Sequence, residues 1–294
     1  ELLLEPNVSP HSYAMRPSQA VALENADLVV FVSHGLTPWL DAPLDALAGD
    51  ALKIEVMEIE PMVHHDYRGD GGHHDHGHDD EHEDEHDDHE DEHEEAHDDD
   101  HDDHGDDHKD EHEDEHADEH GEGTLDPHGW LDPLNAKRWV EEVAKSLASS
   151  DPDNAVTYMA NAEAAQQSLD LLITDIEAQI AAVKGRHYMT LHDAFQYFDA
   201  RFGLEFAGSV ALGDASEPSP ARIATARAEL AEHNVECVFT EPQQSPRLVK
   251  VVIEGTSAHT GVLDPMGADL TPGPDLYSEL LRGMANSFAT CLQN

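Results

Sequence analysis

The chain has 294 residues, among them 65 acidic, 15 basic and 24 histidine side chains, so its formal net charge is −50 with histidine neutral. A charge of this sign argues against binding to nucleic acid or to an anionic membrane surface, and it favours cationic partners. No run of 18 or more apolar residues occurs, so the sequence predicts no direct insertion into a membrane.

The first sixty residues follow the alternation that is typical of an α/β domain. Leu28–Val32 is a continuous apolar run of strand length, as expected for a buried parallel strand. In chain order, the predicted elements are a strand at Leu2–Leu4, a helix at Pro17–Asn25, the strand at Leu28–Val32, a helix at Leu36–Leu47 and a strand at Ala51–Ile59. Strands that alternate with helices indicate a mainly parallel sheet flanked by helices.

The segment from His64 to Glu122 interrupts this pattern. It holds 17 of the 24 histidines and 31 acidic residues against two basic ones. Imidazole is the commonest protein ligand for zinc and related metals, so a tract this rich in histidine indicates metal binding. The alternative is a solvated acidic linker, which accounts for the acidic residues but not for the recurring histidines. Because it has almost no apolar residues to offset the entropy of ordering, we expect a disordered metal-binding loop over residues 64–123.

Fifteen histidines of this loop are candidates for secondary metal sites. They are His73, His74, His76, His78, His82, His86, His89, His93, His97, His101, His104, His108, His112, His116 and His120. From His82 onward they recur every three or four residues, which would place them on one face of a helix. Zinc-dependent helix formation over 82–120 and drift in a low-complexity repeat both remain open. Circular dichroism of this peptide, titrated with zinc, distinguishes them by a gain of helical signal.

After the loop, two helices precede a second α/β pattern. In chain order, we predict helices at Pro133–Leu147 and Pro152–Val183, a strand at Tyr188–Leu191, a helix at Ala194–Phe202, a strand at Glu205–Ser209, a helix at Pro220–His233, a strand at Val235–Thr240, a helix at Pro246–Gly255, a strand at Gly261–Leu263 and a helix at Leu276–Cys291. The helix over 152–183 would extend about 45 Å, enough to run along two domains. We therefore divide the chain into an N-terminal α/β lobe (1–150), a linking helix (151–184) and a C-terminal α/β lobe (185–294).

Three of the seven histidines outside the loop are predicted to lie at strand-to-helix corners: His11, His128 and His192. Ligands of open α/β sheets bind just outside the carboxyl ends of the strands. Three imidazoles that converge there could form a zinc site, with a carboxylate or a water completing the tetrahedron. Asp264, which follows the predicted strand at Gly261–Leu263, is the best carboxylate candidate. Taken singly, each histidine could equally well be structural.

Six motifs, in their order along the chain, carry a resemblance to a known family. They are Ser-Pro-His-Ser-Tyr-Ala-Met-Arg-Pro-Ser at 9–18, His-Gly-Trp-Leu-Asp-Pro at 128–133, His-Asp-Ala-Phe-Gln-Tyr-Phe at 192–198, Glu-Pro-Ser-Pro at 217–220, Phe-Thr-Glu-Pro-Gln at 239–243 and Leu-Asp-Pro-Met-Gly at 263–267. Together with the acidic histidine-rich loop, they make the chain similar to the periplasmic zinc-binding proteins of high-affinity zinc-uptake ABC transporters. The resemblance covers nearly the whole chain.

This resemblance implies two α/β lobes joined by one long rigid helix, with the metal in the cleft between the lobes. It implies ligands at His11, His128 and His192, and a fourth position that varies across the family. Because Pro10 stands where some members have a glutamate, Asp264 or water remains for that position. Manganese members usually have glutamate as the third ligand, so His192 favours zinc.

The resemblance also implies partners and a location. We expect capture of Zn²⁺ in the periplasm by a monomer, delivery to a membrane permease of an ABC transporter, and a secretory leader that has been removed. The family normally begins with a strand and a helix ahead of the segment that starts here at Glu1. Two cysteines without CxxC spacing are plain thiols in the cytosol and pair in an oxidising compartment. Cys237 and Cys291 match a cysteine pair of some zinc members, which implies a disulfide.

Two other functions are compatible with these motifs. A manganese or iron binding protein of the same fold would differ only in its metal preference. A zinc-dependent hydrolase, by contrast, needs a general base beside the metal-bound water, and Glu241 is the candidate. We favour Glu241 as a hydrogen-bond acceptor that orients a metal ligand, and therefore expect a binding protein and not an enzyme.

Overall fold

The computed structural model describes residues 1–4, 8–68, 125–211 and 218–293. All of them belong to one compact unit, which comprises residues 1–72 and 122–294. The candidate ligands of the loop from His73 to His120 lie outside the described residues, as does Glu217 of the 217–220 motif. The described residues contain no helix long and apolar enough to cross a membrane.

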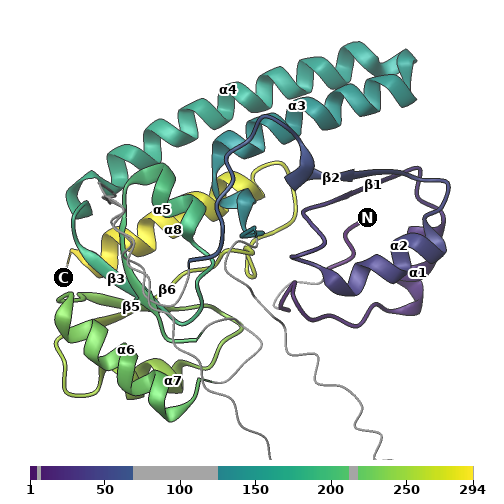
Figure 1. Cartoon of the computed structure of the whole chain (residues 1–294). Helices are drawn as coiled ribbons and strands as arrows, with labels where there is room; N and C mark the ends of the chain where they lie inside the picture. The colour runs from purple at the N-terminus through teal and green to yellow at the C-terminus, as the bar shows by residue number, and fades with distance from the viewer. Residues whose placement is uncertain (5–7, 69–124, 212–217, 294) are drawn as a thin grey trace, which may run out of the picture. The chain divides into compact units, whose positions relative to one another are not determined.

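The N-terminal part contains a small parallel sheet with two helices beside it (Figure 1). Its elements are α1 (Pro17–Glu24), β1 (Leu28–Phe31), α2 (Asp41–Leu47) and β2 (Leu52–Glu55), with 3₁₀ turns η1 (Pro38–Leu40) and η2 (Val56–Glu58). Strand β1 pairs with β2 so that Leu28 lies opposite Leu52. The predicted helix and strand at Leu36–Leu47 and Ala51–Ile59 are each shortened by one of these turns.

The predicted strand at Leu2–Leu4 is wrong, because this segment has no strand partner among the described residues. Leu3 instead packs against the apolar cluster that includes Leu23, Val29 and Leu44. Its carbonyl oxygen accepts a hydrogen bond from the side-chain amide of Gln19. A side chain on α1 therefore satisfies the backbone here in place of a neighbouring strand.

Two antiparallel helices follow the undescribed segment and form an extended pair (Figure 1). They are α3 (Pro133–Ser150) and α4 (Ala155–Ile180), with η3 (Gly129–Leu131) before α3 and with η4 (Pro152–Asn154) and η5 (Ala181–Val183) flanking α4. The Asp132 carboxylate caps α3 by accepting from the Leu134 N–H. Because α4 contacts both α3 and the last helix, the predicted long helix runs along elements from both parts of the chain.

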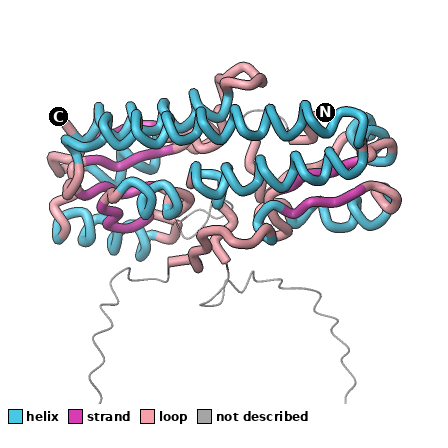
Figure 2. The backbone as a smooth tube through the Cα atoms, turned by 90° about the horizontal axis from the view of Figure 1, so that it is seen from above, coloured by secondary structure: helices cyan, strands magenta, loops and turns pink. Residues whose placement is uncertain are grey.

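The C-terminal part is a four-stranded parallel sheet in the order β4-β3-β5-β6. Its elements are β3 (His187–Thr190), α5 (Gln196–Phe202), β4 (Glu205–Ser209), α6 (Pro220–Glu232), β5 (Cys237–Thr240), α7 (Pro246–Ile253), β6 (His259–Val262) and α8 (Leu276–Leu292). Figure 2 shows the strands in two separate groups, with the long helices running past both. Because all four strands are parallel, the residues that follow β3, β5 and β6 emerge at one edge of the sheet.

One hydrophobic core joins the two parts. It contains Met57 and Leu131 from the N-terminal part together with Ile176 of α4, Tyr188 of β3 and Phe288 of α8. Smaller clusters lie beneath α1 and α2 and beneath α6 and α7. This core extends across the proposed lobe boundaries at 150/151 and 184/185. The division into lobes therefore stays a prediction.

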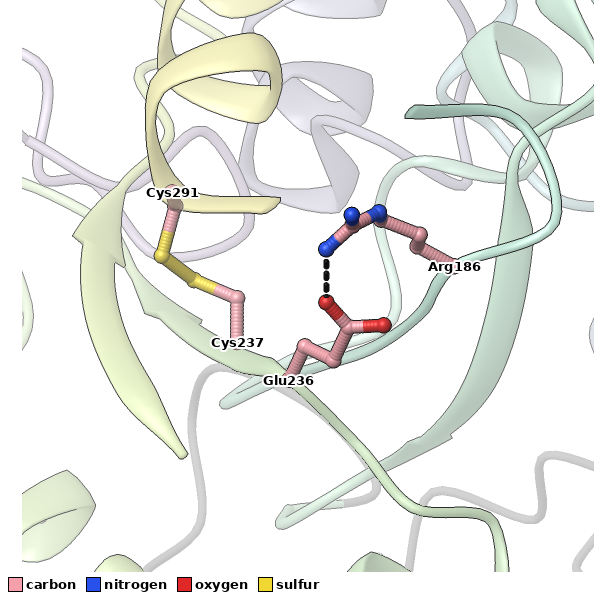
Figure 3. The surroundings of a disulfide bond; sticks show 4 residues. All are labelled: Arg186, Glu236, Cys237 and Cys291. Atoms are coloured by element: carbon pink, nitrogen blue, oxygen red, sulfur yellow. Dashed lines mark hydrogen bonds and ion pairs between the residues drawn. A yellow bond between two sulfur atoms is a disulfide. The ribbon is translucent and has the colours of Figure 1, made fainter. Parts of the chain in front are cut away.

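The predicted disulfide is confirmed. Cys237 of β5 is bonded to Cys291 of α8, with their Cα atoms 6.0 Å apart, and Figure 3 shows the bond spanning strand and helix. Beside it, Arg186 forms an ion pair with Glu236. The last helix is thus covalently attached to a central strand.

Gly261 provides a test of packing in this region. A Cβ added to Gly261 would lie 2.4 Å from Cε1 and 2.6 Å from Cδ1 of the buried Phe239 ring, and 3.3 Å from the Cys291 sulfur. We therefore expect Gly261→Ala to lower the free energy of unfolding by about 1–3 kcal/mol, measured by urea denaturation. Gly49→Ala is the control, because a Cβ there meets nothing within 4 Å and Gly49 lies outside the helices. If Gly261→Ala and wild type had equal free energies of unfolding, Gly261 would not be packed tightly against Phe239.

Candidate metal centre

Three histidines that are far apart in the sequence come together in the structure. One ring nitrogen from each of His11, His128 and His192 lies within 4.8 Å of the others, the only such group found among the described residues. His192 comes two residues after β3, as predicted for a strand-to-helix corner. His11 precedes α1 and His128 precedes η3, but neither follows a named strand in the described chain. The structure thus brings together the three predicted histidines, although only one of the three predicted corners is present.

The spacing of these nitrogens suits a tetrahedral metal ion. Nε2 of His11 and Nε2 of His128 are 3.4 Å apart. Zinc–nitrogen bonds of about 2.0–2.1 Å at tetrahedral angles place two ligand nitrogens about 3.3–3.4 Å apart. The three rings also meet edge to face, with centroids 5.2–5.8 Å apart. The donor set therefore fits Zn²⁺ without rearrangement of the His11–His128 pair.

His192 is oriented by Glu241, which directly follows β5. Nδ1 of His192 donates to Oε1 of Glu241 at 3.0 Å, and both side chains are buried. Glu241 also accepts from the amides of Gln243 and Gln244, at 2.7 and 2.9 Å. A carboxylate at Nδ1 keeps the proton there and leaves the Nε2 lone pair for a metal.

His128 is oriented in the same way by Asp126, a residue that the sequence analysis missed. Nδ1 of His128 donates to Oδ1 of Asp126 at 2.6 Å, and the backbone N–H of His128 donates to the same oxygen at 3.0 Å. The two side chains are only 2% and 1% exposed. The signal available in the sequence was the Asp-Pro-His spacing, which allows an aspartate to bond both backbone and ring two residues on.

His11 lies on a loop that is held at two points. Its backbone N–H donates to Oγ of Ser9 at 3.2 Å. The carbonyl oxygen of Pro10 accepts from the indole N–H of Trp39 at 2.8 Å. His11 is partly exposed, whereas the other two histidines are buried.

Asp264 is placed after β6 and is already bonded to its own loop. Its carboxylate accepts from the backbone N–H groups of Met266, Gly267 and Ala268, at 3.1, 2.8 and 2.7 Å. It is not a member of the group of three histidines. The indole N–H of Trp130 donates to the neighbouring Pro265 carbonyl at 2.9 Å, which ties this loop to the segment that carries His128.

Glu241 supports a specific prediction. Glu241→Gln removes the negative charge beside the His192 ring while keeping the size of the side chain. We expect zinc affinity at the metal centre to fall about tenfold, because loss of a residue that orients a ligand typically costs 10–100-fold. Chelator competition measures the change, and the exposed Glu254→Gln is the charge-matched control. An affinity equal to that of wild type would show that the carboxylate has no such effect.

Comparisons with known proteins match nearly the whole chain to one family. The family model described as "Zinc-uptake complex component A periplasmic" matches residues 1–291. The high-affinity zinc uptake system protein ZnuA of Paracoccus denitrificans (strain Pd 1222) is 46% identical over 293 residues, covering 99% of this chain and 84% of the relative. The protein of the same name from Brucella abortus (strain 2308) is 42% identical over 294 residues, with the same coverage of 99% and 84%.

Solved structures share the fold at lower identity. A crystal structure of ZnuA has a TM-score of 0.71 at 21% identity and covers 99% of this chain and 89% of its own. The solute-binding protein FpvC from Pseudomonas aeruginosa in complex with Mn²⁺ has a TM-score of 0.74 at 18% identity, again covering 99% and 89%. These likenesses and the observed architecture confirm the predicted α/β class with parallel sheets flanked by helices and one long helix.

Proposed function

The chain belongs to the zinc-uptake complex component A family of periplasmic proteins, and on this premise we propose that it captures Zn²⁺ in the periplasm and delivers it to the membrane permease of an ABC transporter. The observation that carries the proposal is the convergence of His11, His128 and His192 at ligand spacing. Two of these imidazoles are held by buried carboxylates, which prepares their Nε2 atoms for a metal ion.

Binding without catalysis is supported by the surroundings of Glu241. A hydrolytic zinc site requires a general base that is available to a metal-bound water. Glu241 instead accepts hydrogen bonds from His192 and from the amides of Gln243 and Gln244. These bonds favour its role in orienting His192, in keeping with a family of transport proteins.

The donor set favours zinc over manganese. Three imidazole nitrogens suit Zn²⁺, whereas Mn²⁺ sites generally rely on carboxylate and water oxygens. An oxygen ligand, either Asp264 or a water, would complete the tetrahedral coordination of the metal. Asp264→Asn distinguishes them: the affinity for zinc falls sharply if the carboxylate is a ligand, and it is nearly unchanged if the carboxylate serves only its own loop.

We further propose that the protein works as a monomer with two lobes, residues 1–150 and 185–294, joined by the helix over 151–184. The metal would be held where the segments that carry His11 and His128 meet the segment that carries His192. We expect the histidines from His73 to His120, which lie outside the described residues, to add weaker zinc sites.

Growth under zinc limitation tests the proposed function. In a bacterium that lacks its own periplasmic zinc-binding protein, the wild-type chain should restore growth in medium with a zinc chelator. A variant with alanine at His11, His128 and His192 should not, although it is exported in equal amount. Restoration by this variant, or rescue of manganese-limited but not zinc-limited growth by the wild type, would contradict the proposal.

A further inference from the structure

Arg68 is the last described residue before the gap at 69–124. Two carboxylates of the C-terminal part hold its side chain. Nη1 donates to Oδ1 of Asp193 and Nη2 donates to Oδ2 of Asp199, each at 2.8 Å. The guanidinium carbon also lies 4.1 Å from the centre of the Phe206 ring. The side chains of Asp193 and Asp199 are only 14% and 4% exposed, so the ion pairs are largely shielded from water.

The charge states of Arg68, Asp193 and Asp199 depend on one another. Burial acts to lower the pKa of Arg68, but attraction to Asp199 and Asp193 outweighs it and raises that pKa. Burial raises the pKa of Asp199 to about 6, and the guanidinium of Arg68 opposes this shift. Removing the guanidinium would leave two buried carboxylates without their cation, which is strongly unfavourable.

Arg68 thereby holds the segment that carries one of the metal ligands. Asp193 directly follows His192, and Asp199 lies on α5, the helix that begins four residues after His192. The two ends of the guanidinium therefore bind the chain immediately after the ligand and again one helical turn into α5. Asp199 is further fixed by a hydrogen bond from the hydroxyl of Tyr188 on β3.

The backbone beside Arg68 is joined to the segment that carries a second ligand. Asp66 forms an antiparallel bridge with Leu125, and the N–H of Asp126 donates to the carbonyl oxygen of His65 at 2.8 Å. His65 and Asp66, which were predicted as part of the disordered loop, are instead ordered and paired with Leu125 and Asp126. Asp126 in turn accepts both hydrogen bonds of His128 described above.

Tyr197 of α5 strengthens the same connection. Its hydroxyl donates to the carbonyl oxygen of Asp126 at 2.9 Å and accepts from the N–H of His65 at 3.1 Å. The segments around His192 and His128 are therefore linked through residues 65–68 by a continuous series of backbone pairs, hydrogen bonds and ion pairs.

We propose that Arg68 is a positioning residue of the metal centre, which joins the segment carrying His192 to the segment carrying His128 and so keeps their imidazoles at ligand spacing before Zn²⁺ binds. The inference rests on the proposed function, because it concerns the same site. Its physical basis is preorganisation: ligands already held in place lose less freedom when the metal arrives.

Zinc titration of the full-length protein in the presence of a high-affinity chelator tests this role. We expect Arg68→Gln to weaken the tightest zinc site about tenfold, with Arg68→Lys between Arg68→Gln and wild type, since lysine keeps the charge but not the two-pronged geometry. Arg282→Gln, which removes an equal charge from an exposed ion pair with Asp175, should leave the affinity unchanged. The visible spectrum of bound Co²⁺ should change in Arg68→Gln and not in the control.

A double mutant separates positioning from general stability. In the His192→Ala background, Arg68→Gln should change zinc affinity less than twofold, because Arg68 acts through His192. If Arg68→Gln does not fold, Asp193→Asn removes the contact nearest His192 while leaving the Asp199 ion pair, and it should weaken binding in the same direction. A folded Arg68→Gln or Asp193→Asn protein with wild-type affinity and Co²⁺ spectrum would overturn the inference. An unchanged affinity in His192→Ala alone would instead overturn the proposed site.

Discussion

Replacing His128 with alanine is expected to weaken zinc binding at the metal centre by more than about 100-fold. His128 is 2% exposed, its Nε2 lies 3.4 Å from that of His11, and Asp126 fixes its ring. The variant loses one metal–nitrogen bond outright, and loss of a residue that merely orients a ligand already costs 10–100-fold. It also leaves the buried Asp126 carboxylate without the ring N–H.

This result must be measured apart from the histidine-rich segment, which would bind zinc in either protein. Chelator competition in chains that both lack residues 69–122 isolates the metal centre. His259→Ala is the matched control, because it removes an exposed imidazole from the start of β6. If His128→Ala bound zinc as tightly as wild type under these conditions, His128 would not be a ligand.

Reduction of the Cys237–Cys291 bond is expected to lower the free energy of unfolding by about 4 kcal/mol. The bond closes a loop over a sequence separation of 54 residues, and opening it gives the unfolded chain much more freedom than the folded one. Both cysteines are buried, so the folded state without the bond keeps most of its packing. Urea denaturation with and without reductant measures the difference.

The double variant Cys237→Ala, Cys291→Ala provides the control, since reductant should not change its stability. Thiol labelling of the denatured, unreduced wild-type protein should detect no free cysteine. Two labelled cysteines, or identical urea midpoints for the oxidised and reduced wild type, would contradict the prediction.

The order of elements could be predicted from the sequence because it depends on local patterns. Apolar runs bounded by turn residues located β1 and the strands of the C-terminal sheet. The predicted start of the helix at Pro220 is also the observed start of α6, where the Ser219 hydroxyl caps the helix by accepting from the Arg222 N–H. The prediction of a strand at Leu2–Leu4 failed because a strand also needs a neighbouring strand. This apolar segment has none among the described residues.

For the metal centre, too, some features could be predicted from the sequence and others could not. The identities of its three histidines could be recognised from motifs, and the cysteine pair from the family resemblance. The residues that orient the ligands could not all be recognised: Glu241 was inferred, whereas Asp126 and Arg68 were not. Asp264, the expected carboxylate candidate, proved to be bonded to its own loop.

Sequence alone therefore determined the α/β class and most of the helix and strand order, and it identified the three candidate metal ligands that the fold brings together, because these follow from residue periodicity and ligand chemistry. Tertiary structure alone decided which carboxylate faces which imidazole and how Arg68 connects their segments. The physical reason is that a hydrogen bond or ion pair forms only within about 3–4 Å. Distances on that scale between residues more than a hundred positions apart, such as Arg68 and Asp193, are set by the packing of the whole fold.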